Sequence, residues 1–169
     1  LYPQNLLVGK EQNKNMSESL EKFTNIAKED QQRAKTLFFS EAFKEEYLKD
    51  RREEKELYHQ LLLGRNRNQI LEEFLLSSGQ KNPVLLSAAK TIYQATIMNL
   101  DKPLEIKVKR EGWGYLVGRI KSDGTFLSLH KNTFQAEDFE DGTLTIYADM
   151  KTIPKDGDID HLIIQTVYQ

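Results

Sequence analysis

The sequence contains no cysteine, one tryptophan and only four prolines among its 169 residues. The absence of cysteine excludes disulfides, thiol catalysis and cysteine-ligated zinc sites. No hydrophobic run reaches the length of a membrane span and no signal peptide is visible, so we expect no membrane insertion in this segment. The formal net charge of −2 provides no overall attraction to nucleic acid or to an anionic surface.

The composition is that of a folded protein. Hydrophobic residues make up 38% of the chain and charged residues 30%, which is enough for a core in one or two small domains. The chain begins with Leu1 instead of methionine, and we therefore expect it to be a piece of a longer protein. Residues 1–15 pair a short apolar patch with a polar stretch and are expected to form a poorly ordered lead-in.

Residues 16–101 are expected to form a helical subdomain of about four helices, because apolar residues recur there at intervals of three, four and seven. The first helix is expected to begin near Asn15, the second near Ser40 as one long helix, and the third near Asn68 with Gly79 at its end.

A charged segment, residues 49–56, lies within the expected second helix. Opposite charges three and four residues apart, as in Arg51 with Glu54 and Arg52 with Glu56, suit a solvated helix face.

The fourth helix has the clearest start signal in the sequence. Asn82 is a candidate N-cap and Pro83 follows at the first helical position, where its missing N–H costs nothing. Residues 84–98 carry an apolar face, so this helix is expected to continue to Met98.

From residue 104 the hydrophobic period changes to two. Leu104, Ile106 and Val108 alternate with charged residues, which is typical of a strand with one exposed face. Turn signals follow at 111–112, 122–124, 141–142 and 156–157, the second of them typical of a hairpin. We therefore predict an α+β protein in which residues 104–169 form a small antiparallel sandwich or barrel of five or six strands.

Turn and core residues in 104–169 recur at the runs 114–118, 123–129, 138–139 with Gly142, 156–157 and 163–166. This spacing resembles the immunoglobulin-like repeats of large bacterial proteins, of the BACON type, and the resemblance implies a small antiparallel immunoglobulin-like β-sandwich. It implies a module without catalytic activity, used for spacing or for binding proteins or carbohydrate. The helical subdomain is not part of that pattern.

Trp113 and Tyr115 are the candidate binding residues. They flank Gly114, and an aromatic pair on an exposed turn is a plausible platform for a sugar or a peptide. The competing interpretation, which we favour, is that Trp113 covers the end of the sandwich core.

Asp156, Asp158 and Asp160 are the candidate metal ligands. Alternate aspartates on an irregular loop resemble a Ca²⁺ site, but the spacing and the distal glutamate of an EF-hand loop are missing. Turn formation is the simpler interpretation, so we expect no cofactor.

The three histidines, His59, His130 and His161, lack metal-ligand spacing. A His/Asp site would require His130 and His161 to meet across paired strands. The arginine pairs at 51–52 and 65–67 are too few to predict nucleic-acid binding.

The function that we predict is a non-catalytic structural or interaction module of a larger bacterial protein, with a protein partner. The alternatives are a carbohydrate-binding module and an enzyme with a His/Asp site. The apolar helix stripes leave open whether the chain is a monomer or part of a dimer.

Overall fold

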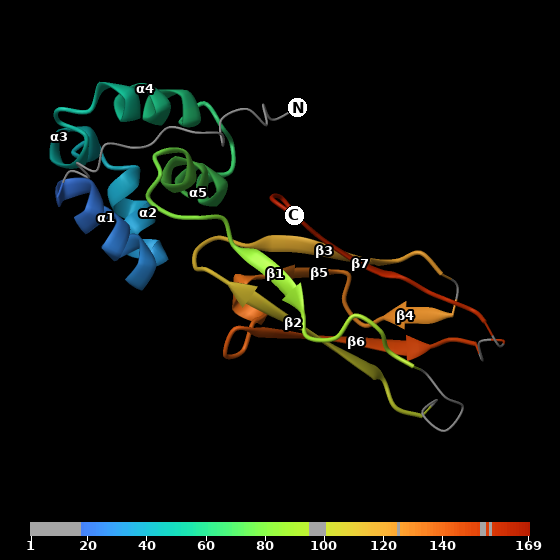
Figure 1. The fold of residues 1–169 in the computed structure, drawn as a ribbon. Helices are drawn as coiled ribbons and strands as arrows, with labels where there is room; N and C mark the ends of the chain where they lie inside the picture. The colour runs from blue at the N-terminus through green and yellow to red at the C-terminus, as the bar shows by residue number, and fades with distance from the viewer. Residues whose placement is uncertain (1–17, 95–100, 125, 153–154, 156) are drawn as a thin grey trace.

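A computed structural model describes residues 18–94, 101–124, 126–152, 155 and 157–169. A helical part precedes a β-sandwich, and Figure 1 shows the helices gathered at one end of the sandwich, with α5 nearest to it. The α+β class is therefore confirmed. The helices are α1 (Glu18–Glu29), α2 (Gln31–Phe38), α3 (Phe43–Tyr47), α4 (Arg52–Leu61) and α5 (Arg67–Ser77).

The first two expected helices are each divided in two. The carboxylate of Asp30 accepts a hydrogen bond from the N–H of Arg33 at 2.9 Å, so it caps α2 and separates it from α1. Arg51 has a non-helical backbone, with φ −121° and ψ 85°, and lies between α3 and α4. The ion pairs of Arg51 with Glu54 and of Arg52 with Glu56 are confirmed, at 2.5 and 3.1 Å.

The prediction for the third helix, α5, is confirmed. Asn66 caps its start through hydrogen bonds to two backbone N–H groups. At its end Gly79 adopts φ +73°, and the N–H groups of Gly79 and Gln80 bond to the carbonyls of Leu76 and Leu75. This pair of bonds is a Schellman motif, in which a left-handed glycine stops the helix.

Aromatic side chains dominate the helical core. Five fully or almost fully buried rings pack edge-to-face, tilted or stacked: Phe23, Phe38, Phe43, Tyr58 and Phe74. The Tyr58 hydroxyl donates a hydrogen bond to the carbonyl of Phe38 at 2.8 Å, which satisfies the one polar group among these rings.

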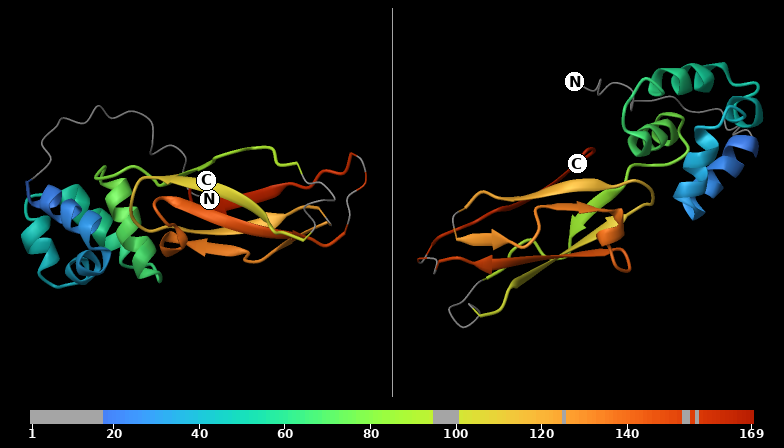
Figure 2. Two further views of the ribbon diagram at one scale, coloured as in Figure 1. Left: turned by 90° about the horizontal axis from the view of Figure 1, so that it is seen from below. Right: turned by 180° about the vertical axis from the view of Figure 1, so that it is seen from behind.

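Two antiparallel sheets form the sandwich. The strands are β1 (Leu85–Ala88), β2 (Leu104–Glu111), β3 (Val117–Ser122), β4 (Leu127–Leu129), β5 (Thr133–Gln135), β6 (Thr143–Met150) and β7 (Leu162–Thr166). One sheet has the order β1-β2-β6-β4 and the other β5-β3-β7, and Figure 2 shows the two sheets from two further sides. Buried residues of both sheets form one core. The order β1-β2-β6-β4 corresponds to the A-B-E-D sheet of an immunoglobulin fold, and the neighbours β3 and β7 correspond to its C and F strands. Strand β5 has no counterpart in that pattern, because it follows β4 in the chain and pairs with β3.

The predicted fourth helix is wrong where the structure describes it. Residues 85–88, which the expected helical subdomain 16–101 included, form β1 and pair with β2 from Leu85 opposite Glu111 to Ala88 opposite Val108. Val84 is 2% exposed and lies in the sandwich core. Pairing with β2 therefore outweighs the Asn82–Pro83 start signal; the expected continuation over 95–98 lies outside the described residues.

The hairpin predicted at residues 122–124 is also wrong. β3 and β4 belong to different sheets, so they are not hairpin partners. The carboxylate of Asp160 accepts hydrogen bonds from the Ser122 hydroxyl, the Gly124 N–H and the Leu127 N–H. These bonds hold the connection against the start of β7. By contrast, Asp141 and Gly142 form the predicted turn, with φ +49° and +74°.

The outer edge of β1 is occupied by a side chain. The Gln169 amide accepts a hydrogen bond from the Leu86 N–H at 2.8 Å and donates one to the Leu86 carbonyl at 3.0 Å, as a neighbouring strand would. We expect Gln169→Ala to accelerate amide hydrogen exchange at Leu86. Exchange at Ala89, whose N–H bonds to Lys107 of β2, is the control and should not change. Equal effects at both amides would show that Gln169 does not act through this edge.

Candidate functional site

A buried ion pair lies where the helical part meets the sandwich. It joins Glu72 of α5 to Lys81, which precedes β1, and both side chains are 1% exposed. Among the described residues Glu72 is the one charged residue that is buried as a whole. Burying a charge is costly unless it is paired and hydrogen-bonded, so such a pair marks a specifically built site.

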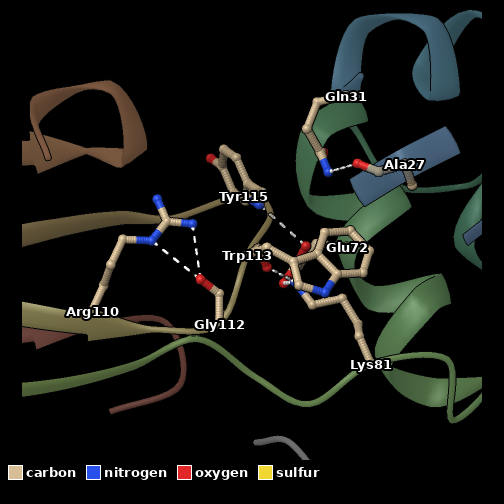
Figure 3. Close-up of polar contacts among 8 residues, drawn as sticks. All are labelled: Ala27, Gln31, Glu72, Lys81, Arg110, Gly112, Trp113 and Tyr115. Carbon is tan, nitrogen blue, oxygen red and sulfur yellow. Dashed lines mark hydrogen bonds and ion pairs between the residues drawn. The ribbon is translucent and has the colours of Figure 1, made fainter. Parts of the chain in front are cut away.

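The sandwich supplies the remaining contacts of this pair (Figure 3). The Tyr115 N–H donates to Glu72 Oε2 at 3.2 Å, and Lys81 Nζ donates to the Trp113 carbonyl as well as to Glu72 Oε1. The ammonium also lies 4.5 Å from the centre of the Trp113 ring, where the π face favours a cation. The segment 113–115 is therefore tied to both charges.

Glycines allow this segment to approach the charges. Gly112 and Gly114 have φ +99° and +106°, a region that residues with a Cβ rarely adopt. A Cβ on Gly114 would lie 2.7 Å from Glu72 Oε2 and closer still to Lys81 Nζ, so the pair occupies the space that a side chain would need.

Two further contacts flank the ion pair. The Asn66 amide donates to the Tyr115 hydroxyl at 3.3 Å, which ties the start of α5 to the start of β3. The Arg110 guanidinium donates to the Gly112 carbonyl at 3.3 and 3.4 Å, and its charge acts on both members of the pair. We name the group formed by Glu72, Lys81, Trp113 and Tyr115 the junction.

Burial dominates the protonation of the junction. It raises the pKa of Glu72 above 4.5, although Lys81, the Tyr115 N–H and Arg110 favour the carboxylate. Burial likewise lowers the pKa of Lys81 below 10.5 against the pull of Glu72. The stability contributed by Glu72 is therefore fully present below its pKa in the unfolded chain, and it is lost as the pH rises through its higher pKa in the folded protein. The stability contributed by Lys81 is fully present above pH 10.5, and it is lost as the pH falls through its lower pKa in the folded protein.

A carboxyl ¹³C NMR titration should show this difference. We expect the midpoint of Glu72 to lie above 4.5. Glu18 is the control, because the exposed ion pair with Lys22 at 2.8 Å lowers its pKa below 4.5. A Glu72 midpoint at or below that of Glu18 would contradict the dominance of burial.

The structure brings the two predicted binding residues together, but at the junction. Trp113 packs against the helical core, so the interpretation that it covers the end of the sandwich core is wrong. Trp113 and Tyr115 are both half-buried. Their role as a ligand platform stays a prediction.

The predicted metal ligands take part in turns. Asp158 accepts a hydrogen bond from the Lys155 N–H at 2.7 Å, and Asp160 holds the β3–β4 connection described above. Asp156 lies outside the described residues. Within the described ranges, no group of three histidine or acidic side chains is placed to hold a metal ion.

The histidines do not converge on one carboxylate. His130, next to β4, bonds to Asp149 of β6 at 2.7 Å, whereas His161, before β7, bonds to Asp123 at 3.0 Å. These pairs belong to different sheets. Asp160, the sequence neighbour of His161, points its carboxylate to Ser122 and Gly124 instead.

Sequence reasoning missed Glu72 and Lys81. Glu72 lies among inward apolar residues of α5, which was a weak signal of a buried charge. Lys81 lies in a connection that was interpreted as the approach to a helix, so nothing indicated its partner.

The protein is a two-part α+β module in which a buried ion pair joins a helical part to a two-sheet sandwich. The chain belongs to the family described as "Family of unknown function (DUF5717) N-terminal", which matches residues 9–169. The match includes both the helical part and the sandwich. No curated protein and no solved structure matches the chain.

Proposed function

We propose that this chain is a non-catalytic interaction module of a larger bacterial protein and that it binds a protein partner. The observation that carries the proposal is the junction. It ties the helices to the sandwich through the Glu72–Lys81 pair and its bonds to the segment 113–115. One fixed arrangement of the two parts would present surfaces of both to the same partner. The family match across 9–169 supports treating the two parts as one unit.

The other two functions have less support. A sugar platform requires accessible rings, whereas Trp113 lies beneath Lys81 and against the helical core. An enzyme with a His/Asp site requires a shared pocket, whereas His130 and His161 bond to different carboxylates on different sheets. The strand order matches most of an immunoglobulin-like sandwich. The predicted resemblance to BACON-type repeats, which are used for spacing or for binding, agrees with the proposal. In the described part of the chain no helix has the length and apolar character needed to span a bilayer.

The rigidity of the junction is tested by ¹⁵N relaxation. Amides of the helical part and of the sandwich should report one rotational correlation time. Two distinct correlation times would show that the parts move independently and would remove the basis of the proposal.

The binding function is tested with a purified partner. A protein crosslinked to the chain in cells is identified, purified and titrated against the intact chain by calorimetry. We expect saturable binding without chemical change in either protein. The proposed function would be overturned if no purified candidate bound the chain, or if the chain chemically modified one of the candidates.

A further inference from the structure

The outer face of the β5-β3-β7 sheet is unusual in its charge. These three strands contain no aspartate or glutamate, and Arg119 and Lys121 lie exposed on the outward side of β3. The carboxylate that follows β3, Asp123, pairs with His161 at 3.0 Å. The outer face of the other sheet mixes charges, since Glu105 alternates with Lys107 and Lys109 along β2. In a chain whose net charge is −2, the β5-β3-β7 face is therefore locally cationic.

Apolar side chains accompany these cations. Ile163 and Val167 are 41% and 46% exposed. The strand register places Ile163 opposite Lys121 and Gln165 opposite Arg119. Because alternate residues of a strand share a face, Ile163 and Gln165 lie on the same outer surface as the two cations. Val167 is exposed one residue beyond the end of β7. Clustered exposed apolar side chains are typical of an interaction surface.

The surface continues onto the helical part. The bond between Asn66 and the Tyr115 hydroxyl holds the α4–α5 connection beside the start of β3. This connection carries Arg65 and Leu63, which is 86% exposed, and residues 57–71 contain no carboxylate. In Figure 1 and in the right view of Figure 2 the α4–α5 connection lies on the same side of the sandwich as β3 and β7.

We propose that the surface made of the outer face of β5-β3-β7 and the α4–α5 connection docks an acidic polypeptide segment with apolar side chains. The inference rests on the proposed function and specifies the chemistry of the partner. Carboxylates of the segment pair with Arg119, Lys121 and Arg65, and its apolar side chains cover Ile163 and Val167.

Charge and shape favour a polypeptide over other polyanions. Nucleic acid is held mainly by many phosphate contacts, and here a few cations alternate with aliphatic side chains. An anionic bilayer offers a plane, whereas the helical part rises from the end of the sheet in Figure 1.

The probe is a displayed library of random twelve-residue peptides, selected on the intact chain. We expect the selected peptides to be rich in aspartate, glutamate and aliphatic residues. For a selected peptide, Arg119→Glu with Lys121→Glu should weaken binding at least about tenfold, because like charges then face each other. The matched control is Lys107→Glu with Lys109→Glu, which makes the same change of charge at exposed positions of β2 and should leave binding within about twofold.

The outcomes separate this inference from the proposed function. Peptides without an acidic bias, or binding reduced equally by both double variants, would overturn the surface assignment while leaving a peptide-binding module. Failure to select any peptide, with binding of phosphatidylglycerol vesicles or of an oligonucleotide lost in the Arg119 and Lys121 variant, would overturn both. Should the charge reversal impair folding in circular dichroism, Arg119→Gln with Lys121→Gln makes the same test.

Discussion

Replacing Lys81 by alanine is expected to lower the free energy of unfolding by about 3–5 kcal/mol. The substitution leaves the Glu72 carboxylate in a place where its side chain is 1% exposed, with the Tyr115 N–H as its remaining close donor. It also removes the cation from the Trp113 ring and the donor from the Trp113 carbonyl. For a protein of this size the loss corresponds to a fall in melting temperature of about 6–20 °C.

Urea denaturation followed by tryptophan fluorescence measures this effect directly. Trp113 is the single tryptophan, so its emission reports the junction itself. The control is Lys22→Ala, which breaks an exposed ion pair with Glu18 and should change stability far less, because solvent screens that pair. Equal effects of the two substitutions would show that burial of the junction pair has no energetic consequence.

Replacing both members of the pair removes the buried charges without leaving one of them unpaired. Because burial shifts the pKa of both Glu72 and Lys81 toward the neutral form, the ionised pair is costly relative to the unfolded chain at neutral pH. Glu72→Met combined with Lys81→Met should therefore be less destabilised than Lys81→Ala, since no charge is left unpaired. If the double variant lost as much stability as Glu72→Met alone and Lys81→Met alone added together, the two residues would not be coupled.

The sequence predicted those elements whose signals are local. α5 has apolar side chains at helical spacing and a terminal Gly79, and both signals act within a few residues. Its start was predicted near Asn68, and in the structure Asn66 caps it. The turn at Asp141 and Gly142 is equally local, because both adopt positive φ. The boundary between a helical first part and a β last part follows from the change of period and was predictable for the same reason.

The errors arose where distant segments decide. Asn82 and Pro83 are a good helix start in isolation, yet pairing of β1 with β2 and burial of Val84 in the sandwich determine the outcome. The connection after Ser122 similarly depends on Asp160, which lies 38 residues away. A local pattern carries no information about such partners.

The candidate site was half predicted. Trp113 and Tyr115 were singled out as an unusual pair, but their neighbours Glu72 and Lys81 come from another part of the chain. The favoured interpretation placed Trp113 on the end of the sandwich core, and in the structure it packs on the helical core instead. A turn with two glycines indicates that another part of the protein approaches its backbone closely. In the structure this part is the buried ion pair of Glu72 and Lys81.

Gly114→Ala is expected to destabilise the protein by about 2–5 kcal/mol and to loosen the junction. Part of the cost is backbone strain at φ +106°, and the rest is the collision of the new Cβ with the Glu72 carboxylate, 2.7 Å away, and with Lys81. Neither charged group can move aside without breaking its bonds to the segment 113–115.

Gly142→Ala isolates the backbone share of that effect. Gly142 has φ +74°, but a Cβ there would meet no atom within 4 Å, so the expected cost is about 1–2 kcal/mol. Gly114→Ala should also shift the Trp113 emission to longer wavelength because the ring becomes solvated, whereas Gly142→Ala should leave the emission unchanged. If both substitutions cost the same and neither alters the fluorescence, then Gly114 serves only its own turn, and close packing at the junction is not what joins the helices to the sandwich.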